Sequence, residues 1–145
     1  MIKRVFDICF SLSALVLLAP MLALIAVWIR LDSPGPIIFR QERVGLRGRC
    51  FSILKFRTMW RSAEADGLQI TVGADARVTR AGRLLRKYKL DELPQLVNVL
   101  RGDMSVVGPR PEVPRYVALY PSSVGEVVLS VRPGITPPAS VTFRH

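Results

Sequence analysis

Hydrophobic side chains are concentrated at the start of the chain. Residues 5–29 carry a single charge, at Asp7, whereas the chain after Ile29 mixes apolar and polar residues as a folded domain does. A straight helix of this length would reach roughly 37 Å, and the hydrocarbon core of a bilayer is about 30 Å thick. The pattern therefore predicts a membrane helix at residues 1–31 and one polar domain at residues 32–145.

Pro20 divides the apolar segment. A proline inside a helix removes one backbone hydrogen bond and displaces the helix axis, so residues 5–19 and 20–29 form two arms, each too short to cross a bilayer. A bent, re-entrant helix is one interpretation, and a signal anchor with a proline kink is the alternative. The positive-inside rule draws both ends of the segment to the cytoplasmic face, because basic residues flank it on both sides, at Lys3, Arg4, Arg30, Arg40, Arg43 and Arg47.

The polar part is predicted to have an α+β fold. Two β-rich runs, residues 37–39 and 50–56, flank a glycine-containing turn and predict a small hairpin. Residues 79–90 have a helical pattern, with Thr79 as the N-cap and Leu84, Leu85 and Tyr88 as apolar contacts. We expect further short elements, some of them amphipathic, that complete a cytosol-facing globular domain: helices at residues 62–66, 94–100, 113–119 and 123–131, and a strand at residues 104–107.

Basic residues outnumber acidic residues, 21 to 11, which gives a net charge of +10 and excludes an acidic disordered chain. The helix predicted at residues 79–90 has no acid and five basic residues, namely Arg80, Arg83, Arg86, Lys87 and Lys89. Such a helix could lie against anionic lipid headgroups, bind a polyanionic ligand or form a solvated surface. These three alternatives stay open at this point.

Several common catalytic sites are excluded by composition. Two isolated cysteines and a single histidine cannot form a four-ligand zinc site or a disulfide framework, so a metal would be bound by carboxylates and phosphates, which favours magnesium. The sequence has no Walker-type phosphate loop, no Ser-His-Asp set and no HExxH motif. Any catalysis must therefore rest on carboxylates and arginines.

Asp91 and Glu92 are adjacent carboxylates that directly follow the basic helix. In one interpretation Asp91 is only the N-cap of a helix over residues 92–100. In the other, a carboxylate kept ionised by neighbouring cations attacks phosphorus, and its neighbour helps to bind magnesium. Arg110, between two prolines, is either a phosphate ligand on a stiff backbone or part of a surface turn, and Arg132 repeats this pattern more weakly.

Three motifs follow the apolar segment in order: Lys-Phe-Arg-Thr-Met at residues 55–59, the long series from Leu-Asp-Glu to Gly-Pro-Arg-Pro-Glu at residues 90–112, and Val-Arg-Pro-Gly-Ile-Thr at residues 131–136. Over nearly the whole chain, this series resembles the bacterial sugar transferase family of small monotopic phosphoglycosyl transferases. The resemblance implies an enzyme of the bacterial inner membrane, with its catalytic domain on the cytoplasmic face. Such enzymes transfer sugar 1-phosphate from a UDP-sugar to a polyprenol (undecaprenyl) phosphate, with release of UMP, and thereby initiate lipid-linked glycan synthesis for capsule, exopolysaccharide, O-antigen or glycoprotein.

The resemblance also assigns roles to residues. Asp91 would attack the β-phosphate to form a covalent aspartyl-phosphosugar intermediate, and Asp91 and Glu92 would bind Mg²⁺. The expected phosphate and nucleotide contacts are Lys55, Arg57, Arg86, Arg110 and Arg132. The expected partners are the UDP-sugar, the polyprenol phosphate and membrane lipids, but no nucleic acid, and a homo-oligomer is left open. The competing hypothesis is a membrane-anchored basic module that binds nucleic acid or anionic lipid without catalysis, although the few aromatic residues do not suit single-strand binding.

The sequence departs from the family pattern in three places. Ala19 precedes Pro20 where the family often has serine, and Thr-Pro-Pro at residues 136–138 is an unusual continuation of the last motif. Family members generally continue for several tens of residues beyond the position of His145. We therefore expect the C-terminal part of the family domain to be missing from this chain.

Overall fold

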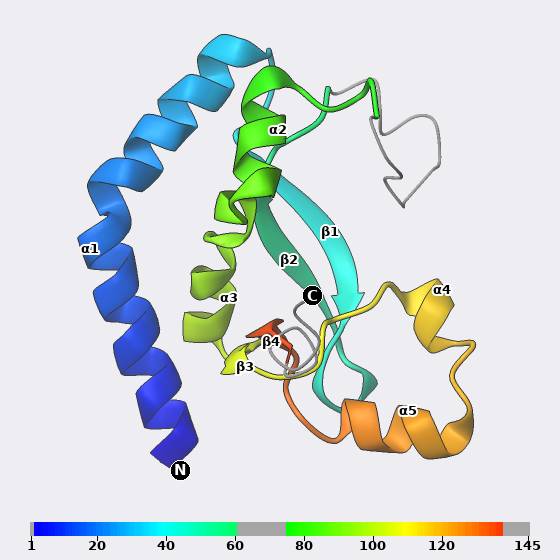
Figure 1. Ribbon diagram of the computed structural model, residues 1–145. Coiled ribbons are helices and arrows are strands. Elements are labelled where there is room, and N and C mark those ends of the chain that lie inside the picture. Colours follow the sequence, from blue (N-terminus) through cyan, green and yellow to red (C-terminus); the bar gives the residue numbers. More distant parts are fainter. Residues whose placement is uncertain (1, 61–74, 138–145) are drawn as a thin grey trace. The chain divides into compact units, whose positions relative to one another are not determined.

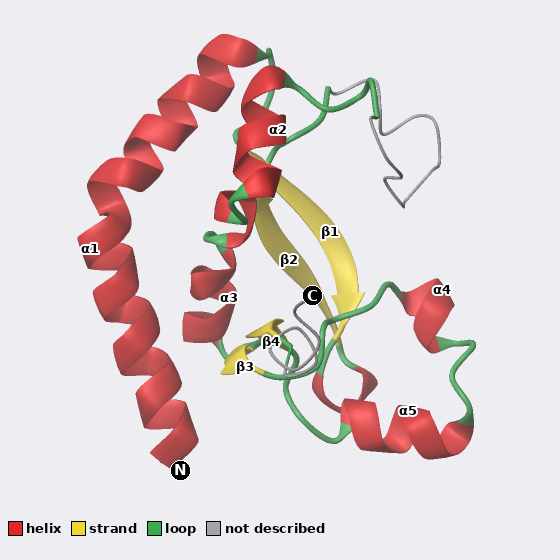
Figure 2. Ribbon diagram, viewed as in Figure 1, coloured by secondary structure: helices red, strands yellow, loops and turns green. Residues whose placement is uncertain are grey.

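The computed structural model describes residues 2–60 and 75–137 (Figure 1). Figure 2 shows that the described part contains both helices and strands, as expected for an α+β chain. The elements, in order, are α1 (Ile2–Asp32), β1 (Ile38–Val44), the 3-10 helix η1 (Leu46–Gly48), β2 (Cys50–Phe56), α2 (Arg80–Lys87), the 3-10 helix η3 (Leu90–Glu92), α3 (Gln95–Arg101), β3 (Ser105–Val107), α4 (Pro114–Val117), α5 (Ser122–Leu129) and β4 (Gly134–Thr136). The helix predicted at residues 62–66 lies outside the described residues.

The chain divides into two compact units. Unit 1 comprises Met1–Leu17, Arg40–Leu54 and Gln95–His145, and unit 2 comprises Leu18–Phe39 and Lys55–Pro94. The boundary between the units falls inside α1 and inside both strands of the β1–β2 hairpin, so each unit contains part of α1 and part of the hairpin. The boundary predicted between residues 31 and 32 concerns the membrane and stays a prediction.

The core of unit 2 joins the second half of α1 to β2 and α2. Ile25 and Ile29, one helical turn apart on α1, pack with Phe56 and Leu85. Thr79 caps α2 as predicted, because its Oγ1 accepts a hydrogen bond from the Gly82 amide at 2.9 Å. The amide of Ala81 donates to Asp32 Oδ2 at 3.0 Å, which ties the start of α2 to the end of α1.

The helix predicted at residues 79–90 is shorter in the structure. It ends at Lys87, because Lys89 adopts a left-handed backbone conformation with φ of 59° and the chain turns there into η3. Two of its three predicted apolar contacts are wrong: Leu85 is fully buried, but Leu84 is 43% exposed and Tyr88 58% exposed. An eight-residue helix buries one face, and successive residues are about 100° apart around it, so Leu84 cannot share the face of Leu85.

The core of unit 1 consists of Ile53 on β2, Val99 on α3 and Met104 before β3, all three nearly or fully buried. The predicted strand at residues 104–107 is present as β3, and it pairs in parallel with β4, a strand that the sequence did not predict. Asn98 joins α3 to β2, since its Nδ2 donates to Ser52 O at 2.8 Å and its Oδ1 accepts from the Leu54 amide at 3.0 Å.

The N-terminal part of α1 is bound to unit 1 by polar contacts. Arg4 donates to the carbonyl oxygens of Val99 and Leu100 at the end of α3. Asp7 is buried, and its Oδ1 accepts hydrogen bonds from Ser105 Oγ at 3.1 Å and from the Val106 amide at 3.0 Å. The only charge in the apolar segment therefore anchors the start of β3.

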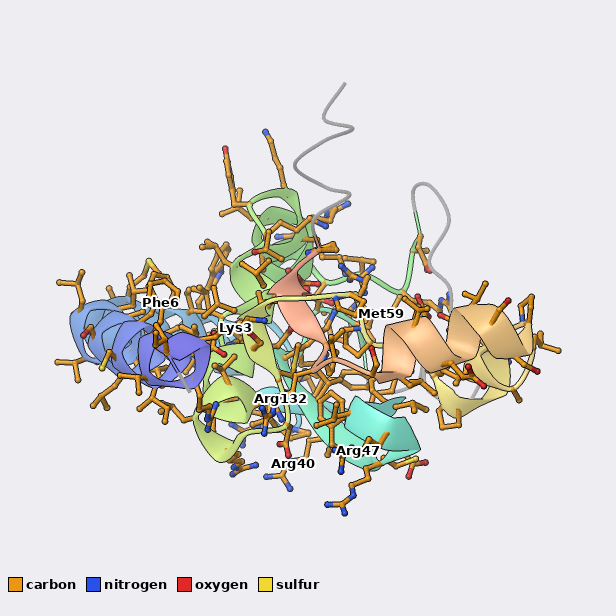
Figure 3. All side chains as sticks on the ribbon, turned by 90° about the horizontal axis from the view of Figure 1, so that it is seen from below. Lys3, Phe6, Arg40, Arg47, Met59 and Arg132 are labelled. Carbon is orange, nitrogen blue, oxygen red and sulfur yellow. The ribbon has the colours of Figure 1, made fainter. Side chains whose placement is uncertain are left out.

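The helix α1 is continuous through Pro20, so the predicted break is not confirmed. Its side chains project around the helix, and Phe6, one of those labelled in Figure 3, is 56% exposed. The helix is long and apolar enough to cross a membrane, and in its most apolar stretch of 18 residues only 11% is buried within the described structure. A long apolar helix with so little burial indicates membrane association.

Candidate active site

The adjacent carboxylates lie in η3, the turn between α2 and α3. Asp91 is 8% exposed and Glu92 9% exposed, so both are buried. The helix α3 begins only at Gln95, and Oδ1 of Asp91 is buried and accepts no hydrogen bond from any described residue. The interpretation of Asp91 as the N-cap of a helix over residues 92–100 is therefore wrong, because a turn separates it from that helix.

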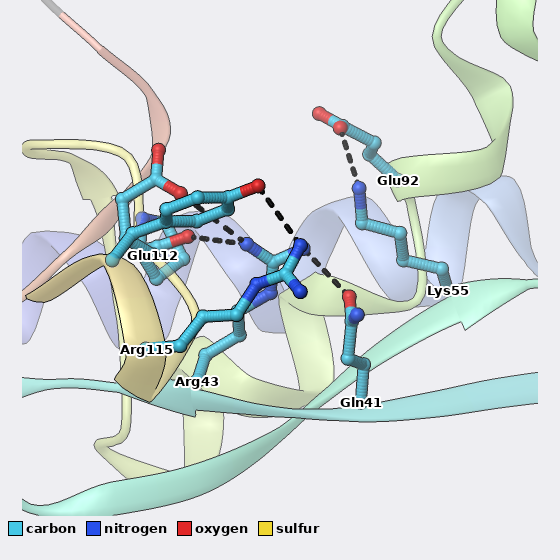
Figure 4. Close-up of polar contacts among 8 residues, drawn as sticks. Gln41, Arg43, Lys55, Glu92, Glu112 and Arg115 are labelled. Atoms are coloured by element: carbon cyan, nitrogen blue, oxygen red, sulfur yellow. Dashed lines mark hydrogen bonds and ion pairs between the residues drawn. The ribbon is translucent and has the colours of Figure 1, made fainter. Parts of the chain in front are cut away.

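Lys55, near the end of β2, binds Glu92. Its Nζ lies 2.9 Å from Glu92 Oε1, and both side chains are mostly shielded from solvent, being 18% and 11% exposed (Figure 4). A charge-assisted hydrogen bond of this length, away from bulk water, is among the stronger polar contacts. The lysine predicted as a phosphate contact thus neutralises one of the two carboxylates in this structure.

Burial raises the pKa of Asp91 above its ordinary value. The positive charges of Lys55 and Arg86 oppose this increase in the pKa, and the negative charge of Glu92 adds to it. Arg86 donates from Nε to Thr58 Oγ1 at 2.8 Å, and burial lowers the pKa of this arginine. Unit 2 therefore places a buried carboxylate in the field of two cations, and one oxygen of this carboxylate accepts no hydrogen bond from residues 2–60 or 75–137.

Arg57 has a different environment from the one that the sequence suggested. Its guanidinium is 6% exposed and donates from Nη2 to Ser33 O at 2.7 Å, to Ser33 Oγ at 2.8 Å and to Ile29 O at 3.5 Å. Its Nη1 donates to Pro36 O. Arg57 thus ties the chain after β2 to the end of α1, and its role as a substrate contact stays a prediction.

Arg110 and Arg132 belong to unit 1, whereas Asp91 and its neighbours belong to unit 2. Their two motifs lie side by side: the Gly134 amide donates to Pro109 O at 2.9 Å, and Arg132 Nε donates to Gly102 O at 2.9 Å. Both arginines are exposed. The structure thus joins the Gly-Pro-Arg and Arg-Pro-Gly motifs, which are more than 20 residues apart in the sequence.

No group of three or more His, Cys, Asp or Glu side chains that could hold a metal ion occurs in residues 2–60 and 75–137. Asp91 and Glu92 alone would give a metal two carboxylates. Magnesium in phosphate-transfer sites is commonly held by one or two carboxylates together with substrate phosphates. The pair therefore suits magnesium that arrives with a phosphate ligand, and Asp91 Oδ1 is the oxygen that has no hydrogen-bond partner among the described residues.

The family model for the bacterial sugar transferases matches residues 1–145, the whole chain. The chain belongs to this family. This bacterial sugar transferase is 45% identical to the UDP-N-acetylgalactosamine-undecaprenyl-phosphate N-acetylgalactosaminephosphotransferase of Aeromonas hydrophila, over 99% of this chain and 34% of the relative. It is 47% identical to the UDP-glucose:undecaprenyl-phosphate glucose-1-phosphate transferase of Caulobacter vibrioides, over 96% of this chain and 53% of the relative. It is also 47% identical to the undecaprenyl-phosphate glucose phosphotransferase of Komagataeibacter xylinus, over 92% of this chain and 26% of the relative.

The transferase chain spans between about a quarter and about a half of the length of these three relatives. All three match the region that contains the motifs at residues 55–59 and 90–112, because each alignment covers more than nine-tenths of the chain. The names of all three relatives include undecaprenyl phosphate, whereas two of them name glucose as the sugar and one names N-acetylgalactosamine.

Sequence reasoning missed two residues that support the motifs of this transferase. Arg43 on β1 donates to Pro111 O at 3.1 Å and to Gln41 Oε1 at 2.6 Å, and it pairs with Glu112 at 3.8 Å (Figure 4). Asp7 anchors β3, which leads into the Gly-Pro-Arg motif. For Asp7 a signal was available, because a charge inside an apolar run needs a partner, whereas nothing in the sequence distinguishes Arg43 from other surface arginines.

Proposed function

We propose that this bacterial sugar transferase moves sugar 1-phosphate from a UDP-sugar to a polyprenol phosphate, undecaprenyl phosphate in bacteria, and releases UMP. Family membership and the names of the three relatives support the reaction class. The observation that carries the proposal is Asp91: a buried carboxylate with one oxygen that accepts no hydrogen bond from a described residue, in the field of Lys55 and Arg86. A structural aspartate would use that oxygen as a hydrogen-bond acceptor, because buried polar atoms are nearly always paired.

The proposed reaction has two displacements at one phosphorus atom. The Asp91 carboxylate attacks the β-phosphorus of the UDP-sugar, the bond from this phosphorus to the bridging oxygen breaks, and UMP leaves with the electron pair. A phosphate oxygen of the polyprenol phosphate then attacks the phosphorus of the aspartyl phosphosugar and releases the carboxylate. The products are a polyprenol diphosphate sugar and UMP, and the enzyme is restored.

The carboxylate and the phosphates that react are all negatively charged, so the neighbouring residues must reduce their repulsion. Phosphoryl transfer depends on neutralising phosphate charge and aligning the attacking group, and Lys55 and Arg86 supply positive charge beside the carboxylate. We assign Arg57, Arg110 and Arg132 as further phosphate or nucleotide contacts. Because Oδ1 of Asp91 is buried, an attack from this oxygen requires a local movement of the side chains around η3.

Mg²⁺ held by Asp91 and Glu92 would neutralise phosphate charge when it is bound. Lys55 already binds Glu92, so the lysine would compete with the ion for this carboxylate. The pair is compatible with a single ion that takes its remaining ligands from phosphate and water.

We further propose that α1 enters and leaves the membrane on the same face, which is the cytoplasmic face by the positive-inside preference. Both ends of α1 are bound to polar parts of the chain, through Asp7 in unit 1 and through Asp32 in unit 2. The basic helix α2 packs against Ile25 and Ile29, and a helix with this charge does not lie in hydrocarbon. Residues 8–24 remain for the hydrocarbon, and at about 1.5 Å per residue they reach roughly 25 Å, less than a bilayer core of about 30 Å.

The test of the proposed reaction follows UMP and lipid product in nanodiscs that contain polyprenol phosphate and Mg²⁺, with a panel of UDP-sugars. We expect one or a few donors to give equal amounts of UMP and polyprenol diphosphate sugar. Asp91→Asn should abolish both products, and Glu42→Gln, which removes an exposed acid from β1, should leave them unchanged. A chain that releases no UMP with any donor, or an Asp91→Asn variant as active as the wild type, would contradict the proposal.

A further inference from the structure

One side of α2 combines exposed cations with exposed apolar groups. Counted from Arg80, the residues Arg83, Leu84, Lys87 and the C-cap Tyr88 follow at i+3, i+4, i+7 and i+8, so all five share one side of the helix, which we call the basic face. All five are exposed, with Leu84 at 43% and Tyr88 at 58%, and none of the three cations forms a salt bridge with a described residue. Lys89, two residues after the last residue of the helix, adds a fourth exposed cation.

The opposite side of α2 is fixed to the membrane helix. Leu85 is fully buried against Ile25 and Ile29 of α1, and the start of α2 is bonded to Asp32 at the end of α1. The two helices therefore lie side by side over the last two turns of α1, as Figure 1 shows within unit 2. Nearby side chains of α1 are exposed and apolar, with Leu24 at 72%, Val27 at 57% and Leu31 at 80% exposed.

The position of α2 puts the basic face beside the point where an apolar helix leaves the hydrocarbon. The headgroup layer begins there, and in a bacterial inner membrane this layer contains anionic phospholipids. Lysine and arginine near such a surface are attracted to it over about a Debye length, and tyrosine favours the headgroup level. Apolar residues between cations on one side of a helix are typical of helices that lie in the membrane interface.

We propose that the basic face of α2 binds anionic phospholipid headgroups and thereby sets the depth of η3 relative to the membrane surface. The proposal rests on the membrane location proposed above for α1, but not on the chemistry proposed for Asp91. Tyr88 precedes Asp91 by three residues, so a lipid contact at this end of α2 fixes the height of the carboxylate turn. Arg80 and Lys87 are about 10 Å apart along the helix axis, which suits a layer of headgroups better than a single phosphate.

The test is a titration of the full chain, in detergent, with phosphatidylglycerol or phosphatidylcholine, read out by native mass spectrometry as the Kd of the first bound lipid. The variant is Arg83→Gln with Lys87→Gln. The matched control is Arg40→Gln with Arg47→Gln, two exposed cations of unit 1 that extend from the hairpin region (Figure 3). A cation near an anionic surface contributes about fivefold in affinity, so we expect the variant to bind phosphatidylglycerol about 25-fold more weakly. The control should change less than about twofold, and neither pair should alter phosphatidylcholine binding.

Three further results complete the test. Leu84→Ser with Tyr88→Ser should weaken binding of both lipids, because it removes the apolar part of the basic face. Equal loss of phosphatidylglycerol binding in the variant and the control would overturn the proposal, since general charge would then suffice. Displacement of phosphatidylglycerol by millimolar inorganic phosphate would also overturn it, because the face would then bind a single free anion. Since lipid binding requires no turnover, the result is independent of the Asp91→Asn activity test.

Discussion

Arg57→Met separates a structural role of this arginine from a role in substrate binding. The guanidinium is 6% exposed and donates to the carbonyl and hydroxyl oxygens of Ser33 and to Pro36 O. Methionine has a similar length and volume but no donor, so the substitution leaves the buried Ser33 carbonyl without this partner. The guanidinium also packs closely against Gly35, because a Cβ added to this glycine would lie only 2.5 Å from Nη1 of Arg57.

The loss of stability can be worked out from these contacts. A hydrogen bond from a charged donor contributes about 1.5–3 kcal/mol, and a buried acceptor left unpaired costs about 1–3 kcal/mol. Part of this loss is offset because the variant no longer buries a charge. We therefore expect the free energy of unfolding to fall by about 2–4 kcal/mol, which lowers the Tm of a chain of this size by about 10 °C.

The assay is thermal unfolding of the purified full chain in detergent, with the KM for the UDP-sugar measured well below the Tm. Arg40→Met is the matched control, because it removes the same side chain from an exposed position on β1 and should change the Tm by less than about 2 °C. If Arg57→Met melted as the control does while its KM rose strongly, the structural reasoning would be refuted. Arg57 would then act through substrate contact alone.

Three other substitutions test separate parts of the account. Asn98→Ala should lower the free energy of unfolding by about 2–5 kcal/mol in denaturant titrations, because it removes the hydrogen-bond partner that the Leu54 amide and the Ser52 carbonyl have in Asn98. An unchanged midpoint would contradict this. Gly134→Ala should lower the free energy of unfolding by about 2–3 kcal/mol and thereby the Tm, because its Cβ would overlap the Gly108 amide nitrogen. Gly125→Ala should not lower the Tm, since its Cβ would have one neighbouring atom, at 3.8 Å. Asp91→Asn should raise the Tm at pH 7–8. The pKa of Asp91 is raised in the folded chain, so the wild type loses stability as the pH rises above the ordinary aspartate pKa, and asparagine, which does not ionise, avoids this loss. This gain should shrink as the pH approaches that value, and an Asn variant that melts lower at every pH would refute the burial argument.

Local signals in the sequence predicted the elements that depend on them. The apolar run became α1, the two β-rich runs around a glycine turn became the β1–β2 hairpin, and Thr79 became the N-cap of α2. Each of these features is set by residues within a few positions of one another, where periodicity and capping chemistry are readable. The adjacent Asp-Glu pair could be found in the same way, because two carboxylates beside a basic helix are conspicuous.

Features that depend on distant residues were not predictable. The strands β3 and β4 have three residues each, too few to show alternation, and they pair residues about 29 positions apart, such as Ser105 with Gly134. The early end of α2 comes from a left-handed Lys89, a conformation that residues other than glycine adopt rarely. The contacts of Arg57 and Lys55 depend on which carbonyl and carboxylate oxygens the fold brings near, so the sequence suggested phosphate ligands for both.

The most direct test of the central claim is the intact mass of the protein after incubation with Mg²⁺ and each UDP-sugar, without polyprenol phosphate. We predict an added mass of one sugar phosphate, equimolar release of UMP, and loss of the adduct when polyprenol phosphate is added. Asp91→Asn should form no adduct, and Glu42→Gln should form it fully. An active chain that never carries the added mass, or an adduct that persists in Asp91→Asn, would contradict the assignment of Asp91 as the nucleophile.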